Sequence, residues 1–257
     1  METSGSAFAG PVQNQRVIVA GGGGVGESPA STARIDVIDL KEPNAHYVPG
    51  PDLPTPTRYP NLVQLPDDSV LISNGSRRYR GRDASDVLLA SLYHPATNTL
   101  TPAADPTVGR DYHSEGILMP NGQVVTLGGN ALFSDEKNTK TATFERRLEI
   151  YTPPYLFHGP RPTITAAPTS ARLGSSMTVT SPDAASITAA RLIRPSAATH
   201  ATNLEQRSVA LTVTHAADGS ISLAVPGEAT LVPPGYYMLF LLGAQGTPSV
   251  ARWVHVS

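Results

Sequence analysis

The side chains of this sequence that are best suited to holding a metal ion are Tyr112, His113 and His200. Tyr112 and His113 are adjacent and stand at the entry of residues 114–119, which read as a β-strand. Neighbouring side chains of a regular strand point to opposite faces, so both can reach one ion only where the pleat is broken, and Gly109 permits such a break. Imidazole suits copper, zinc, iron and nickel, and a phenolate oxygen beside it favours Cu(II).

His200 lies far along the chain, in a loop of small residues between two expected strands. A loop histidine in such a position could project away from its own sheet. Judged by residue type and position alone, the pair Tyr112 and His113 is more typical of an ordinary strand end, and His200 is more typical of a surface histidine. The metal hypothesis therefore needs support from the elements around these residues.

Two other segments could contact a phosphate-bearing partner, but neither pattern is complete. Residues 21–26 read GGGGVG after an apolar strand, as in dinucleotide-binding loops. No apolar helical repeat follows them, so a wide turn is the better interpretation. Four arginines between positions 77 and 82 surround Tyr79, but two aspartates follow closely, which favours a solvated loop over an RNA or phosphate contact. The sequence has no P-loop, serine hydrolase elbow or HExxH zinc motif.

The composition excludes several classes of partner. A net charge of -2 and a pI of about 6.4 give no basic field that would attract nucleic acid or an anionic membrane. Apolar runs such as residues 237–242 are far shorter than the roughly 20 residues of a spanning helix, so we expect no membrane segment. The opening residues lack the basic and apolar regions of a secretory signal. The absence of cysteine excludes disulfides, thiolate metal ligands and a cysteine nucleophile within these residues.

A repeated pattern indicates which elements position the candidate ligands. Residues 17–21, 70–75 and 124–129 are apolar segments that end in glycine, and they begin about 53 or 54 residues apart. The second and third follow matching turn sequences, PDD at 66–68 and PNG at 120–122. Repeats of this length are typical of kelch-type β-propeller blades. The 22 glycines and 24 prolines favour short strands over long helices.

About three such repeats fit before residue 158, whereas a propeller closes with roughly four to eight blades. We therefore expect a partial propeller that lacks its N-terminal blades. The proline-rich segment 152–162 breaks the repeat. Seven short strands are expected after it, near Thr163, Met177, Ala190, Val209, Ile221, Tyr237 and Val254. The sequence thus predicts an all-β chain with the C-terminal blades of a kelch-type propeller at 1–158 and an immunoglobulin-like β-sandwich at 159–257.

Several stretches resemble the galactose oxidase and glyoxal oxidase family of copper radical oxidases, and its bacterial glyoxal-oxidase-like branch in particular. In the expected blades the resemblance rests on GRDYHS at 109–114, MPNG at 119–122 and EIYTPPYL at 149–156. In the expected C-terminal domain it rests on LIRP at 192–195, TH at 199–200, QR at 206–207, PPGYYMLF at 233–240 and PSVA at 248–251.

The resemblance implies one copper ion bound by two histidines and two tyrosines on the propeller axis. His113 matches the histidine of the last blade, and His200 matches the histidine carried by a loop of the C-terminal domain. Tyr112 matches the axial tyrosine that accepts the hydroxyl proton of the substrate. The implied reaction is the oxidation of a small primary alcohol or aldehyde by O2, which is reduced to H2O2.

The sequence departs from the family pattern at the radical cofactor, a tyrosine bonded to a cysteine. Without a cysteine, the 257 residues cannot form this Cys-Tyr cofactor. Tyr59 resembles the radical tyrosine in its context, but its blade directly precedes that of Tyr112, so we do not assign it that role. Trp253 lies in the last expected strand and is predicted to be core.

The sequence therefore predicts the C-terminal portion of a copper radical oxidase, with part of the copper site and no activity by itself. The alternative is a degenerate, non-catalytic kelch and sandwich module that binds a partner. Members of the family are typically extracellular or attached to the cell envelope, and these residues leave the compartment open.

Overall fold

The computed structural model describes residues 2–26, 28–135, 137 and 139–257. The helical segments among them are four short 3-10 turns: η1 (Val12–Asn14), η2 (Asp83–Ser85), η3 (Pro154–Phe157) and η4 (Ala184–Ser186). No α-helix occurs in this part of the chain, and no helix in it is long and apolar enough to cross a membrane. Residues 28–34 after the glycine loop contain no helix, and Glu27 lies outside the described residues. The prediction of an all-β chain is confirmed.

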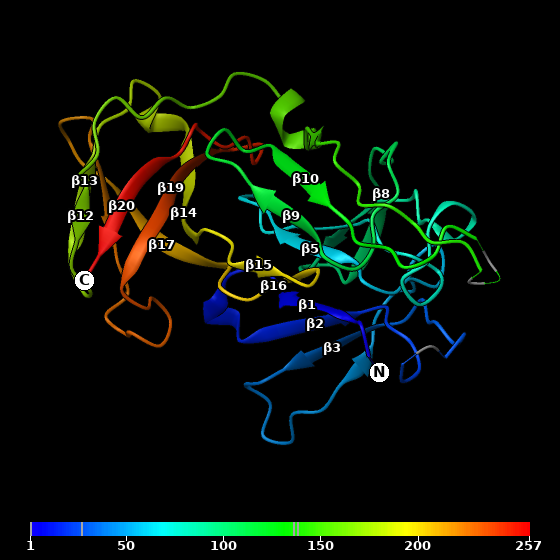
Figure 1. The fold of residues 1–257 in the computed structure, drawn as a ribbon. Helices are drawn as coiled ribbons and strands as arrows, with labels where there is room; N and C mark the ends of the chain where they lie inside the picture. Colours follow the sequence, from blue (N-terminus) through cyan, green and yellow to red (C-terminus); the bar gives the residue numbers. More distant parts are fainter. Residues whose placement is uncertain (1, 27, 136, 138) are drawn as a thin grey trace.

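Three small antiparallel sheets form the first part of the chain (Figure 1). The first sheet has β1 (Gly5–Phe8), β2 (Arg16–Ala20), β3 (Ile35–Asp39) and β4 (Val48–Pro49), paired in that order. The second has β5 (Asn61–Gln64), β6 (Val70–Ser73), β7 (Ser91–His94) and β8 (Thr99–Pro102), also paired in order. The third has β9 (Ser114–Leu118), β10 (Val124–Gly128) and β11 (Glu149–Tyr151), in the order β11-β10-β9.

The repeat seen in the sequence corresponds to these sheets. The three glycine-ended segments form β2, β6 and β10, which are the second strands of the three sheets. The turns before β6 and β10 have Asp68 at φ 70° and Gly122 at φ 82°, so each places a residue in the left-handed region. Among the first strands, β5 lies against both β1 and β9, so the first strands of the three sheets stand side by side.

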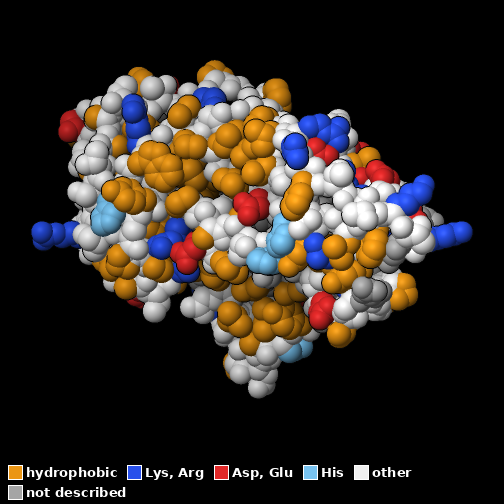
Figure 2. All heavy atoms as spheres, in the orientation of Figure 1, with side chains coloured by type: hydrophobic (Ala, Val, Ile, Leu, Met, Phe, Trp, Pro, Cys, Tyr) orange, Lys and Arg blue, Asp and Glu red, His pale blue; other side chains and the backbone are white. Residues whose placement is uncertain are grey.

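The third sheet leaves an open edge. It has three strands where its neighbours have four, and no strand among the described residues pairs with the outer edge of β11. Leu148 and Ile150 beside this edge are exposed. Figure 2 shows that hydrophobic side chains gather on the face seen in Figure 1, with histidine at the surface near its middle. Exposed apolar patches of this kind commonly mark an interaction surface.

The second part of the chain forms a seven-stranded sheet in the order β12-β20-β19-β14-β17-β18-β13. Its strands are β12 (Ser170–Ala171), β13 (Ser176–Val179), β14 (Ile187–Arg194), β17 (Arg207–His215), β18 (Ile221–Ala224), β19 (Gly235–Gly243) and β20 (Arg252–Val256). The first half of β17 pairs with β14 and the second half pairs with β18. The long strand β17 therefore carries the sheet from one group of strands to the other.

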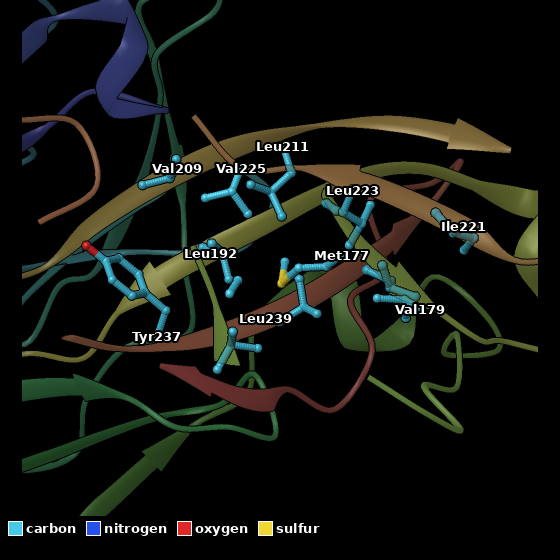
Figure 3. Close-up of a cluster of buried hydrophobic side chains, with 14 of the residues drawn as sticks. Met177, Val179, Leu192, Val209, Leu211, Ile221, Leu223, Val225, Tyr237 and Leu239 are labelled. Atoms are coloured by element: carbon cyan, nitrogen blue, oxygen red, sulfur yellow. The ribbon is translucent and has the colours of Figure 1, made fainter. Parts of the chain in front are cut away.

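A hydrophobic core fills the space between these strands (Figure 3). Met177 of β13 and Leu223 of β18 meet Leu192 of β14 and Leu239 of β19, and all four are buried. Burial of a side chain of this size stabilises the fold by roughly 1.5–3 kcal/mol. This core is the reason that the alternating apolar residues of β13 and β18 face inward.

Two details of the sequence prediction for this part were wrong. Thr163 is not in a strand, because it lies in a segment rich in proline, which cannot donate to a ladder, and its N–H donates to Asp183 instead. The strand expected near Thr163 is replaced by β12, which is the seventh strand of the sheet. Trp253 is not core but 46% exposed. The side chains of Val254 and Val256 in β20 point into the core, so the alternation of the strand turns Trp253 to the other face.

The two parts of the chain are joined by apolar and polar contacts. Phe240 and Met238 of β19 belong to one buried cluster with Leu71 of β6 and Leu118 of β9. The side chain of Gln206 accepts from the Gln64 N–H at 2.7 Å and donates to the Gln64 carbonyl at 3.3 Å. The guanidinium of Arg191 donates to both carboxylate oxygens of Asp68, at 2.7 and 2.6 Å. These contacts fix the larger sheet against the smaller ones.

Candidate metal centre

Tyr112 and His113 lie where the chain enters β9. His113 has φ 63°, and the Ser114 N–H closes a turn by donating to the Asp111 carbonyl at 3.0 Å. The left-handed residue breaks the pleat that would send the two side chains to opposite faces. Their rings are stacked instead, with centroids 3.8 Å apart and planes at 29°. The break in the strand pleat that two adjacent ligands of one ion require is therefore present.

His200 is carried by a small hairpin of β15 (Ala198–Thr199) and β16 (Thr202–Asn203). Its two turn residues, His200 and Ala201, have φ 55° and 66°, as in a type I′ turn. The hairpin leaves the larger sheet and lies against β9, β5 and β1 (Figure 1). His200 is exposed, whereas Ala201 is buried beneath it.

The structure brings the three predicted ligands together. The ring centroid of His200 lies 4.5 Å from that of His113 and 5.4 Å from that of Tyr112. Imidazoles bound to one ion at roughly 2 Å have centroids about 3 Å from the ion, so two at a right angle have centroids about 4.5 Å apart. The spacing of the two histidines therefore fits a shared metal ion.

The hydrogen bonds of the two histidines engage Nδ1. The Nδ1 of His200 lies 2.7 Å from the Thr199 hydroxyl, and the Nδ1 of His113 lies 3.3 Å from the amide nitrogen of Asn130. Burial lowers the pKa of His113, and the charges of His200 and Arg80 lower it further. A metal-bound imidazole must be neutral at the ligating nitrogen, and the lowered pKa of His113 favours the neutral ring.

An aromatic and basic cluster surrounds Tyr112. The ring of Tyr59 lies 5.6 Å from that of Tyr112, and the Arg80 guanidinium lies 4.3 Å from the centroid of the Tyr112 ring. Tyr59 is buried and its hydroxyl has no partner among the described residues. Burial raises the pKa of Tyr59 well above its ordinary value, so it is a neutral phenol rather than a phenolate.

The interpretation of the arginine cluster as a solvated loop is wrong for two of its members. Arg80 covers Tyr112 and also donates to the Asn130 carbonyl at 3.0 Å. Arg82 is largely buried and contacts the carboxylates of Asp86 at 3.2 Å and Glu145 at 3.4 Å. The sequence showed the cluster but could not show that the loop folds back over the end of the third sheet.

Asp111 beside the centre is a buried carboxyl whose surroundings favour the protonated form. It is fully buried, and neither of its oxygens has a hydrogen-bond partner in the described part of the chain. Burial raises the pKa of Asp111 to about 8, against the opposing effect of Arg82. Residue type and spacing alone did not single out Asp111.

The described residues do not provide a complete set of side-chain ligands for a metal ion. No group of three or more His, Cys, Asp and Glu side chains able to hold a metal ion occurs among the described residues. Two imidazoles and one phenol remain as the available donors, and they are types that copper accepts. The residues therefore fit copper as a partial set.

The fold and the site together define an all-β chain of the galactose oxidase type. Residues 161–256 match the family model described as galactose oxidase-like, Early set domain. The chain is 36% identical over 202 residues to a galactose oxidase of Gibberella zeae, and 33% identical over 226 residues to an aldehyde oxidase GLOX of Vitis pseudoreticulata. These matches cover 76% and 80% of the chain. The chain belongs to the galactose oxidase and glyoxal oxidase family.

A solved structure resembles the whole chain. It is that of a fungal alcohol oxidase of the AA5 family in complex with copper, with 28% identity and a TM-score of 0.85 over 99% of this chain. The chain covers 54% of that protein, 28% of the galactose oxidase and 42% of the aldehyde oxidase. It thus spans about half or less of the relatives that it matches.

Proposed function

We propose that these residues are the C-terminal portion of a mononuclear copper radical oxidase and supply part of its copper site. The observation that carries the proposal is the convergence of Tyr112, His113 and His200, from two separate sheets, with a histidine spacing of 4.5 Å. The family and the copper-bound structural neighbour support it. The reaction would convert a primary alcohol and O2 to an aldehyde and H2O2, or an aldehyde, water and O2 to an acid and H2O2.

The chain's own residues would have distinct parts in this chemistry. His113 and His200 would hold copper through Nε2, and Tyr112 would be a third ligand whose phenol oxygen accepts the hydroxyl proton of the substrate. The bound copper would supply a one-electron acceptor for the two-electron oxidation. The other electron acceptor of the family, the Cys-Tyr cofactor, requires a cysteine that these residues do not contain.

We propose further that the three small sheets are blades of a kelch-type propeller, at residues 1–158, and that residues 159–257 form an immunoglobulin-like sandwich. The contacts of β5 with β1 and with β9 support the first assignment, because the inner strands of neighbouring blades lie side by side around the axis of a propeller. The switch of β17 between two groups of strands supports the second.

The open edge of β11 fits an incomplete ring. A cavity of about 380 Å³ lies between the second and third sheets and is lined by Leu71, Thr126, Ile150 and Phe157. Ile150 and Phe157 at its rim are exposed. A fourth strand along β11 would cover both the rim and the unpaired edge, as β4 and β8 cover the equivalent edges of the other sheets.

The test is a copper titration of the pure chain followed by electron paramagnetic resonance. We expect one Cu(II) per chain with coupling to two nitrogens, and no H2O2 from galactose, glyoxal or methylglyoxal. A chain indifferent to copper would overturn the proposal and favour a non-catalytic binding module. Sustained copper-dependent H2O2 release by the pure chain would overturn the claim that the radical cofactor lies outside these residues.

A further inference from the structure

We propose that Asn130 is a positioning residue for this centre, whose side-chain amide holds the orientation of His113 and accepts from its Nδ1 in the metal-binding tautomer. This inference rests on the proposed copper site. The observation behind it is that the Asn130 amide lies 3.3 Å from His113 Nδ1, on the ring nitrogen opposite the proposed metal-binding Nε2. Asn130 is neither a ligand nor part of the resemblance by which the ligands were found.

The main chain of Asn130 is fixed independently of its side chain. Its N–H donates to the Tyr112 carbonyl at 2.6 Å, and its carbonyl accepts from Arg80 at 3.0 Å. Gly128 and Gly129 directly before it have φ 73° and 127°, so the chain turns sharply at the end of β10. The backbone thus presents the amide to His113, and a substitution at 130 can remove the amide while these main-chain contacts stay.

The chemistry of a metal-bound imidazole gives the amide its role. A histidine that binds through Nε2 carries its proton on Nδ1, and that N–H needs an acceptor. The amide oxygen of Asn130 can accept it, whereas the amide nitrogen, which faces His113 here, can only donate. A half-turn of the amide about its terminal torsion exchanges the two atoms without moving the backbone.

The two histidines differ in this respect. His200 Nδ1 faces the Thr199 hydroxyl at 2.7 Å, which can donate or accept and so serves either tautomer. The side-chain amide of Asn130 must instead rotate so that its oxygen faces His113 Nδ1 and accepts from the metal-binding tautomer. A carboxylate at this position can only accept, so it would hold His113 in the metal-binding tautomer before copper arrives.

The experiment compares copper affinity and nitrogen coupling in the parent chain, Asn130→Ala and Asn130→Asp. Asn121→Ala is the matched control, because Asn121 lies in the turn at the other end of the β9–β10 hairpin and contacts Gln123. We expect Asn130→Ala to raise the copper Kd roughly 10–100-fold, the range for lost outer partners of a ligand, and to weaken or broaden one nitrogen coupling. Asn130→Asp should bind copper at least as tightly as the parent, and Asn121→Ala should match the parent.

The outcomes separate this inference from the proposed function. If copper in the parent chain shows no coupling to two nitrogens, both the proposed copper site and the role of Asn130 are refuted. If the parent shows two nitrogens while Asn130→Ala has the same Kd and spectrum, only the role of Asn130 falls. Equal weakening by Asp and Ala also refutes it, because an acceptor then fails to rescue. Circular dichroism checks the fold, and Asn130→Asp decides the matter if Asn130→Ala does not fold.

Discussion

The imidazole rings of His113 and His200 lie with centroids 4.5 Å apart, although the first stands at the entry of β9 and the second belongs to a hairpin that leaves the larger sheet. Each residue has a positive φ, so each stands where the chain departs from regular strand geometry. The pairing therefore depends on how the two parts of the chain are docked as well as on local structure.

Both histidines should contribute to copper affinity. We expect His113→Ala and His200→Ala each to raise the copper Kd by about tenfold or more, because each removes one of three proposed donors. His215→Ala is the control, since His215 is exposed at the end of β17. Isothermal titration calorimetry with competing chelator measures the change. Affinities equal to the parent in both ligand variants would refute the assignment.

The docking contact made by Gln206 should matter for both stability and metal binding. Gln206→Ala leaves the buried Gln64 N–H without its side-chain acceptor, which costs on the order of 1–3 kcal/mol of unfolding free energy. Because Gln206 follows the hairpin that carries His200, copper should also bind more weakly. Glu205→Ala is the comparison: its partly exposed ion pair with Arg194 should contribute roughly 0–1 kcal/mol. Equal urea midpoints for the two variants would contradict this prediction.

Because Asp111 is buried, we expect the stability of the metal-free chain to depend on pH. Its pKa is raised to about 8 in the folded protein from 3.8, so the folded state binds the extra proton. The associated stability is complete below pH 4 and is lost as the pH rises toward 8. Asp111→Asn should flatten this dependence and raise the unfolding free energy at pH 8 by on the order of 1–3 kcal/mol. Urea denaturation between pH 5 and pH 8 tests it, and identical pH profiles of variant and parent would contradict it.

Arg58 should be irreplaceable in shaping the glycine loop. Its guanidinium is fully buried and donates to the carbonyls of Gly24 at 2.6 Å and Ser28 at 2.7 Å. A Cβ at Gly23 would meet this guanidinium at 2.7 Å, which explains a glycine there.

Lysine cannot reproduce the planar fork of Arg58, so Arg58→Lys should lower the unfolding free energy by on the order of 2–4 kcal/mol. Arg34→Lys at an exposed ion pair is the control and should change it by less than about 1 kcal/mol. Thermal unfolding measures both, and a parental melting temperature for Arg58→Lys would count against the role.

Much of the fold was readable from local patterns. The segments that became β2, β6 and β10 alternate or continue apolar residues up to glycine, and a strand of this kind is specified within a few residues. The turns at Asp68 and Gly122 follow from residue types that accept a positive φ. His200 and Ala201 gave no such signal, because neither is a residue typical of a type I′ turn.

The sequence by itself determined the strand-rich character of the chain, the types of donor available and the absence of cysteine. Only the tertiary structure decided that His200 meets His113, that Arg80 covers Tyr112 and that Asn130 faces His113. The physical reason is distance along the chain. Strand alternation is a local property, whereas these contacts require the larger sheet to pack on the smaller ones through buried groups such as Phe240 and Gln206.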